Sequence, residues 1–177
     1  PTNRVTVGLA PAVTATVQTN SAIRDVEIAA KNVVYVVTAD SLLCFLGGDL
    51  QAMSPVQVPP GVSVSGIGLA RDSGVVLADG EHKQVVRLTA GQVPDSSFGD
   101  QGAVSSLGEG NGSLVTPVDV AVDALTDEVY VADAGSNRIV KLDRSGRFVG
   151  YAELTGRPLH VAVGGAVYVT TGGPALE

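Results

Sequence analysis

Short apolar runs alternate with small polar breaks along most of the chain. Residues 130–142, YVADAGSNRIVKL, are typical: one apolar run ends at Asp133, and a second run begins after Asn137. No long segment places apolar residues at helical spacing. The composition agrees, because 45% of the residues are hydrophobic, only 4% are aromatic, and 22 Gly and 9 Pro are present. The pattern predicts an all-β fold of many short strands joined by tight turns.

The chain contains an internal repeat. Residues 119–143 align with residues 66–89, and weaker copies cover residues 25–38 and 158–171. The steps between the equivalent residues that end the second run are 41, 54 and 38, at Thr38, Asp79, Asp133 and Thr171. A period near 40 residues with three or four short strands per unit is typical of β-propeller blades. We therefore predict a β-propeller with about four blades in this chain.

The best-preserved copy predicts four strands, VDVAV, EVYVAD, RIVKL and RFVGYAEL, with LTDE and DRSGR as hairpin turns. The fourth strand is less clear in the other copies. The long step of 54 comes from an insertion over residues 92–114, which is rich in Gly, Ser and Asp. This composition predicts a loop between blades that is mobile unless something binds it.

The two ends of the chain allow two arrangements. The segment TNRVTV near the start resembles the third-strand segment SNRIVK, and AVTATVQ would follow it as a fourth strand. The terminal strands would then share one blade and close a four-bladed ring. Alternatively, the chain is a segment of a larger or dimeric propeller, whose open edges pair with another copy. In both cases the length fits a single domain over residues 1–177.

Residues 114–150, LVTPVDVAVDALTDEVYVADAGSNRIVKLDRSGRFVG, resemble an NHL repeat through P-x-D-V-A-V-D, Y-V-A-D and N-R-I-x-K. The resemblance extends to residues 66–99, which end in Phe98 and Gly99, and is degenerate in the other two copies. The first copy has ADSLLCF in place of the Asn-Arg pair. The NHL family implies a propeller that is commonly a platform for binding proteins, in some members for RNA, and occasionally an enzyme.

The polar cluster Asp133, Asn137 and Arg138 is interpreted as turn structure. Short polar side chains at strand ends bond free backbone groups and tolerate unusual dihedral angles, and an Arg stem lies across a neighbouring strand. Parts of the cluster recur at Asp79 and at Asn3-Arg4, in places that do not converge on one active site. Asn137 is kept as a candidate binding residue because its loop shares a face with the residues considered next.

Candidate site residues lie at the start of the first strands, at Asp25, Gly66, Asp119 and His160. In a propeller these strands surround the axis, so Asp25, Asp119 and His160 would converge there and offer oxygen and nitrogen ligands to a divalent metal or a small ligand. His82 lies on a loop of the same face. The alternative is that the Asp side chains belong to the ordinary blade pattern and point between blades.

Charge and cysteine content narrow the function classes. The net charge of -7, with 11 scattered Lys and Arg residues, argues against nucleic-acid binding, which needs clustered basic residues to neutralise phosphates. The single Cys44 cannot form an internal disulfide; its apolar neighbours predict a buried thiol, and it does not identify the compartment.

No apolar run is long enough to span a membrane. The chain begins at Pro1 with neither Met nor an apolar signal region, which suggests a processed product or a piece of a longer protein.

The function predicted from the sequence is a recognition platform for a protein or small ligand. The alternative is a metal-assisted hydrolase or lyase with an axial site built from Asp25, Asp119 and His160. A three-His zinc site within one chain is excluded, because His82 and His160 are the only histidines. RNA binding, as in some NHL proteins, is a third interpretation that conflicts with the acidic charge.

Overall fold

A computed structural model describes residues 3–9, 13–19, 21–29, 33–38, 42–46, 51–109 and 111–172 of the chain. Every helix or strand found in these ranges is a β-strand, and none of the described residues forms an apolar helix that could cross a membrane. The strands form five antiparallel sheets, which confirms the predicted all-β class. Cys44 is in β5, but its side chain lies outside the described ones.

Three of the sheets have four strands each and correspond to the predicted blades. Blade 1 contains β3 (Ile23–Ile28), β4 (Val33–Thr38), β5 (Leu42–Leu46) and β6 (Gln51–Ala52). Blade 2 contains β7 (Gly66–Leu69), β8 (Val75–Asp79), β9 (Gln84–Leu88) and β10 (Ala103–Val104). Blade 3 contains β11 (Pro117–Val122), β12 (Val129–Asp133), β13 (Arg138–Leu142) and β14 (Phe148–Glu153).

The two remaining sheets have two strands each. One pairs β1 (Asn3–Leu9) with β2 (Val13–Thr19), and the other pairs β15 (Arg157–Val163) with β16 (Val167–Gly172). In the described ranges no sheet joins these two hairpins, so closure of a ring by this one chain is not shown. We call β15–β16 blade 4, because it continues the repeat.

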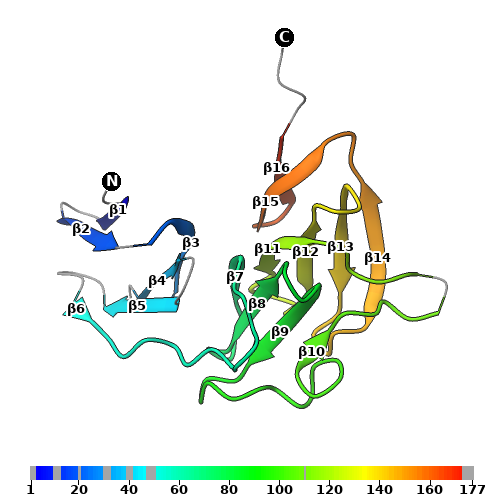
Figure 1. The fold of residues 1–177 in the computed structure, drawn as a ribbon, viewed down its shortest axis with the longest axis horizontal. Coiled ribbons are helices and arrows are strands. Elements are labelled where there is room, and N and C mark those ends of the chain that lie inside the picture. Colours follow the sequence, from blue (N-terminus) through cyan, green and yellow to red (C-terminus); the bar gives the residue numbers. More distant parts are fainter. Residues whose placement is uncertain are drawn as a thin grey trace, which may run out of the picture.

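The sheets follow one another around a common centre, with β3, β7, β11 and β15 on the inside (Figure 1). The first strands contact each other in sequence order, β3 with β7, β7 with β11, and β11 with β15. This order places the first strand of each blade at the axis, as the repeat predicts.

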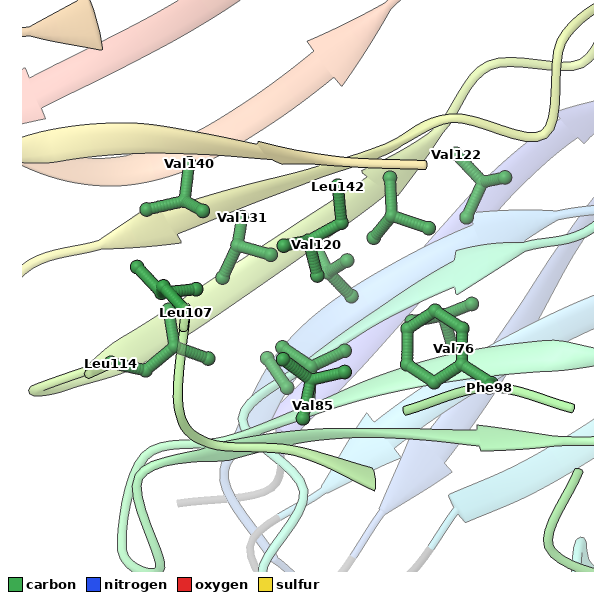
Figure 2. Packing of buried hydrophobic residues seen from close by; sticks show 13 residues of the cluster. Val76, Val85, Phe98, Leu107, Leu114, Val120, Val122, Val131, Val140 and Leu142 are labelled. Carbon is green, nitrogen blue, oxygen red and sulfur yellow. The ribbon is translucent and has the colours of Figure 1, made fainter. Parts of the chain in front are cut away.

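Aliphatic side chains fill the space between neighbouring blades. Val76 and Val85 of blade 2 face Val120, Val131 and Val140 of blade 3, and all five are almost completely buried (Figure 2). Period-2 alternation gives each strand two apolar faces, because both sides of an interior blade are covered. The high Val content and low aromatic content are explained by this flat packing between sheets.

The insertion over residues 92–114 is not the free loop that its composition predicted. It contains β10, the fourth strand of blade 2, and it places Phe98, Leu107 and Leu114 in the core between blades 2 and 3, each at most 3% exposed. Its apolar residues are few and widely spaced among polar ones, so the sequence pattern gave no sign that they are buried. The insertion is therefore part of the folded blade structure.

Candidate functional site

The equivalent positions at the start of the first strands occupy one register. Each pairs with the residue that precedes Thr38, Asp79, Asp133 or Thr171, the equivalent positions of the second strands: Asp25 with Val37, Gly66 with Ala78, Asp119 with Ala132, and His160 with Thr170. In β3, β11 and β15 a register shift comes immediately before this position. A bulge of this kind re-aims the following side chain. The residue equivalence predicted from the sequence is confirmed, whereas the bulges were not predicted.

Asp25 and Asp119 each connect two blades. Asp25 Oδ1 accepts a hydrogen bond from its own neighbour, Val26 N (2.7 Å), and Oδ2 accepts one from Ile67 N of blade 2 (2.9 Å). Asp119 repeats this arrangement with Val120 N and with Val161 N of blade 4, both at 2.8 Å. The carboxylates therefore satisfy backbone donors of successive first strands, and they point between blades.

Gly66 leaves the space that Asp119 occupies. A Cβ at this position would overlap Asp119 Oδ1 and would lie 2.7 Å from Asp119 Cα. Blade 2 consequently lacks the carboxylate of its neighbours, and the backbones of β7 and β11 approach closely. The departure of Gly66 from the repeat is thus explained by packing against blade 3.

His160 lies beside Asp119 but is largely open to solvent. Its Nδ1 is 3.5 Å from Asp119 Oδ2, and its side chain is 59% exposed. The imidazole is therefore a neighbour of Asp119, but it is not among the side chains that line the cavity between the first strands.

His82 is held by the turn in which it lies. Its Nδ1 is 2.9 Å from Oδ2 of Asp79, which is completely buried, and its backbone N donates to Oδ1 of the same residue (3.1 Å). Gln84 Nε2 donates to Oδ2 as well (3.0 Å). Asp79 thus organises the turn between β8 and β9, and the His82 side chain remains 46% exposed at its surface.

Asp133 performs a similar structural task in blade 3. Its Oδ1 accepts hydrogen bonds from Val115 N (3.0 Å) and Thr116 N (2.8 Å), and its Oδ2 accepts one from Arg138 Nε (3.2 Å). Asn137 has a φ of 49°, so the unusual dihedral predicted for it is confirmed. The bonded backbone groups belong to the segment before β11 and not to the turn itself, a long-range contact that the sequence did not indicate.

Glu27 is a third carboxylate near Asp25 and Asp119, and the sequence analysis did not select it. Glu27 follows Asp25 by two residues on β3, so both side chains lie on the same face. Together with Asp119 they line a small cavity of about 110 Å³ between the first strands. The D-V-E spacing of residues 25–27 was the available signal.

The fold has counterparts among solved structures. Virginiamycin B lyase from Staphylococcus aureus aligns with 96% of this chain at 14% identity and a TM-score of 0.66. A calcium-binding protein, regucalcin, from Agrobacterium tumefaciens aligns with 88% at 15% identity (TM-score 0.59), and the Pan2 WD40 domain of Neurospora crassa aligns with 85% at 15% identity (TM-score 0.62). The chain has a β-propeller fold.

The comparisons establish the fold alone. The alignments cover 56%, 55% and 44% of the three propellers, so the chain spans about half the length of these structures. No protein-family model and no curated protein matches the sequence.

The cavity with Asp25, Glu27 and Asp119 is bordered by the inner strands β3, β7, β11 and β15. Burial, reinforced by the charges of Asp25 and Asp119, raises the pKa of Glu27 to about 7. Burial and the neighbouring Asp25 likewise raise the pKa of Asp119 to about 7. The described residues include no group of three His, Cys, Asp or Glu side chains arranged to hold a metal ion.

We expect the stability of the propeller to fall as the pH rises through the range in which Glu27 and Asp119 ionise. Their ordinary pKa values, 4.5 and 3.8, apply in the unfolded chain, and the folded chain holds both protons more tightly. The free energy of unfolding therefore decreases between about pH 4 and pH 7. Glu27→Gln removes one ionisation, and since Glu27 is only partly buried we expect a gain of about 1–2 kcal/mol at pH 8 and none at pH 4.

Urea unfolding at the two pH values measures this effect. Glu81→Gln, at an exposed turn position, is the control. If both variants changed the stability equally at pH 8, the cavity would not be the origin of the pH dependence.

Proposed function

We propose that residues 1–177 form a single NHL-type β-propeller domain that recognises a protein or a small ligand through its loop-bearing face. We define this face by the β8–β9 turn, the β12–β13 turn and the segment that precedes β11. The register pairs the start of β11 with the end of β12, so these segments lie at the same end of the strands. Val115, His82 and Asn137 are exposed there.

The observation that carries this proposal is that both carboxylate oxygens of Asp25, and both of Asp119, accept backbone hydrogen bonds, one within the strand and one from the next blade. Side chains that would be expected to do chemistry at the axis are already engaged with backbone N–H groups. Asp79 is likewise engaged in fixing the β8–β9 turn, and Asp133 in fixing the segment before β11. The carboxylates thus build a rigid scaffold, and rigid scaffolds that present loops are typical of binding sites.

The NHL assignment rests on residues 114–150. Their motif positions have structural roles that suit a repeating blade: Asp119 connects blades, Asp133 fixes the segment before β11, and Arg138 pairs with Asp133. The repetition of the first of these roles at Asp25 supports a repeat-wide pattern.

Replacement of exposed loop residues tests the platform. We expect His82→Ala combined with Asn137→Gly to weaken binding of the native partner about tenfold, because truncation of the few interface residues that carry the binding energy costs more than about 1 kcal/mol each. Glycine is chosen at position 137 because it tolerates the positive φ. Purified chain with a photo-crosslinker at position 83 would first capture the partner, whose affinity is then measured by titration.

Leu125→Ala is the matched control for this experiment. Leu125 is 85% exposed in the β11–β12 connection, at the opposite end of the strands. Binding that is lost with Leu125→Ala and retained by the double variant would place recognition on the other face. Absence of any specific partner would overturn the platform itself.

The metal-assisted hydrolase or lyase remains the second candidate, and the shared cavity of Asp25, Glu27 and Asp119 is the observation that favours it. Their oxygens are of the type that divalent cations prefer, but among the described residues they are not already arranged to hold one, so a cation would have to draw them together. His160, whose Nδ1 is 3.5 Å from Asp119 Oδ2, would be the proton-transfer group beside this cavity. The test is turnover of an ester or lactone substrate by the unmodified chain and by His160→Ala. If His160→Ala abolished turnover without loss of stability, the enzyme hypothesis would be preferred over the binding platform.

A further inference from the structure

Blade 4 has a free strand edge in the described part of the chain. Its strand β16 pairs with β15 alone, whereas the equivalent β12 of blade 3 pairs with β11 on one side and with β13 on the other. An unpaired edge presents a row of backbone donors and acceptors that template the addition of another strand. The described part of the chain thus contains two strands of blade 4, and no described strand occupies the positions of its third and fourth strands.

An apolar groove lies beside this edge. It has a volume of about 460 Å³ and is lined mainly by Tyr130, Ile139, Tyr151, Leu154, Val167 and Val169. Tyr151 of blade 3 is 52% exposed, and Tyr168 of β16 is 63% exposed. Between blades 2 and 3, by contrast, the third strand β13 supplies Val140 and Leu142, which are completely buried. The groove is the space that a third strand of blade 4 would cover.

The β1–β2 hairpin has the pattern of the missing half. The hairpin begins with Asn3-Arg4, which matches Asn137-Arg138 at the start of β13, the third strand of blade 3. It continues as two antiparallel strands, like the third and fourth strands of a blade. Its strands pair only with each other in the described ranges. In this structure β1–β2 and β15–β16 lie apart, at opposite ends of the row of blades (Figure 1).

We propose that β1 of a second copy of this chain pairs with β16, so that β1–β2 of each copy completes blade 4 of the other. Two such joints, related by a twofold axis, close the ring without a free edge. Two chains would contribute about eight blades, which lies within the range known for propellers. The cavity between the first strands, lined here by β3, β7, β11 and β15 alone, would then face the same strands of the partner copy.

The register of the joint follows from blade 3. There Val131 of β12 is opposite Val140 of β13. The repeat equates Val131 with Val169, and the Asn-Arg alignment equates Val140 with Thr6. Val169 of one copy should therefore be opposite Thr6 of the other.

Disulfide cross-linking between two separately prepared variants tests this pairing. In a Cys44→Ser background, chains with Thr6→Cys are mixed with chains with Val169→Cys and oxidised, and the products are identified by non-reducing mass spectrometry. Directly opposite residues on paired strands suit a disulfide. We expect a mixed dimer at least tenfold more abundant than with Thr16→Cys, which lies on the adjacent outer strand β2.

The unmodified chain provides an independent measurement. Sedimentation equilibrium should give twice the chain mass at micromolar concentration. A monomer, or equal cross-linking by Thr6→Cys and Thr16→Cys, would overturn the proposal. An intrachain disulfide in the combined Thr6→Cys and Val169→Cys variant would also overturn it and assign closure to one chain. None of these outcomes depends on the proposed binding function.

Discussion

Gly99→Ala should destabilise the propeller by about 3–5 kcal/mol. Gly99 has a φ of 57°, a conformation that costs a residue with a Cβ about 1–2 kcal/mol. The added Cβ would overlap the carbonyl oxygen of Ala103 and would lie 2.6 Å from Val104 Cγ2, so the backbone of the insertion would have to move. The neighbouring Phe98 is completely buried, and Gly99 N donates to Ser145 O of blade 3 (2.9 Å).

Urea unfolding measures this loss, with Gly150→Ala as the control. A Cβ at Gly150 meets nothing within 4 Å, and its backbone has no positive φ, so the control should change stability by less than about 1 kcal/mol. Equal stabilities of the two variants would mean that residues 92–114 do not pack between blades 2 and 3.

The fold could be predicted because blade packing imposes a repeated pattern. Both faces of an interior blade are buried, so its first three strands are largely apolar runs, and the turns between them require polar residues and glycine. The four strands of blade 3 were predicted in order, and the structure places β11 to β14 there. β10 was missed, since Ala103–Val104 is a two-residue strand within a polar segment.

The candidate site was predicted less completely because it depends on contacts between blades. Sequence alignment identified Asp25 and Asp119 as equivalent, but their orientation is set by bulges that no local signal reveals. Glu27 has a distinctive environment because it is partly buried beside Asp25 and because Asp119, far away in sequence, approaches it in space. The repeat therefore indicated which positions are equivalent, and the packing of blades determined what each position does.

Asp133 illustrates how a motif that resembles a functional cluster stabilises the blade. Its side chain is completely buried, and the partner Arg138 is 13% exposed. Arg138 also donates from Nη2 to Ser113 O (3.0 Å) and lies 5.6 Å from the ring centre of Tyr151. The pair thus links the end of β12 with the segment before β11 and with the outer strand β14.

Asp133→Ala should lower the free energy of unfolding by about 3–5 kcal/mol. The change leaves the Arg138 guanidinium without its carboxylate, and it leaves the N–H groups of Val115 and Thr116 without an acceptor. Glu128→Ala is the control, because the Glu128–Lys141 pair (2.8 Å) is partly exposed and should contribute at most about 1 kcal/mol.

Urea unfolding of both variants distinguishes a buried network from an exposed pair. A native-like stability of Asp133→Ala would mean that the cluster is dispensable to the blade, and its residues would then be free for recognition on the loop-bearing face. A large loss confined to Asp133→Ala would assign the cluster to the scaffold and leave exposed neighbours such as His82 and Asn137 for contact with a partner.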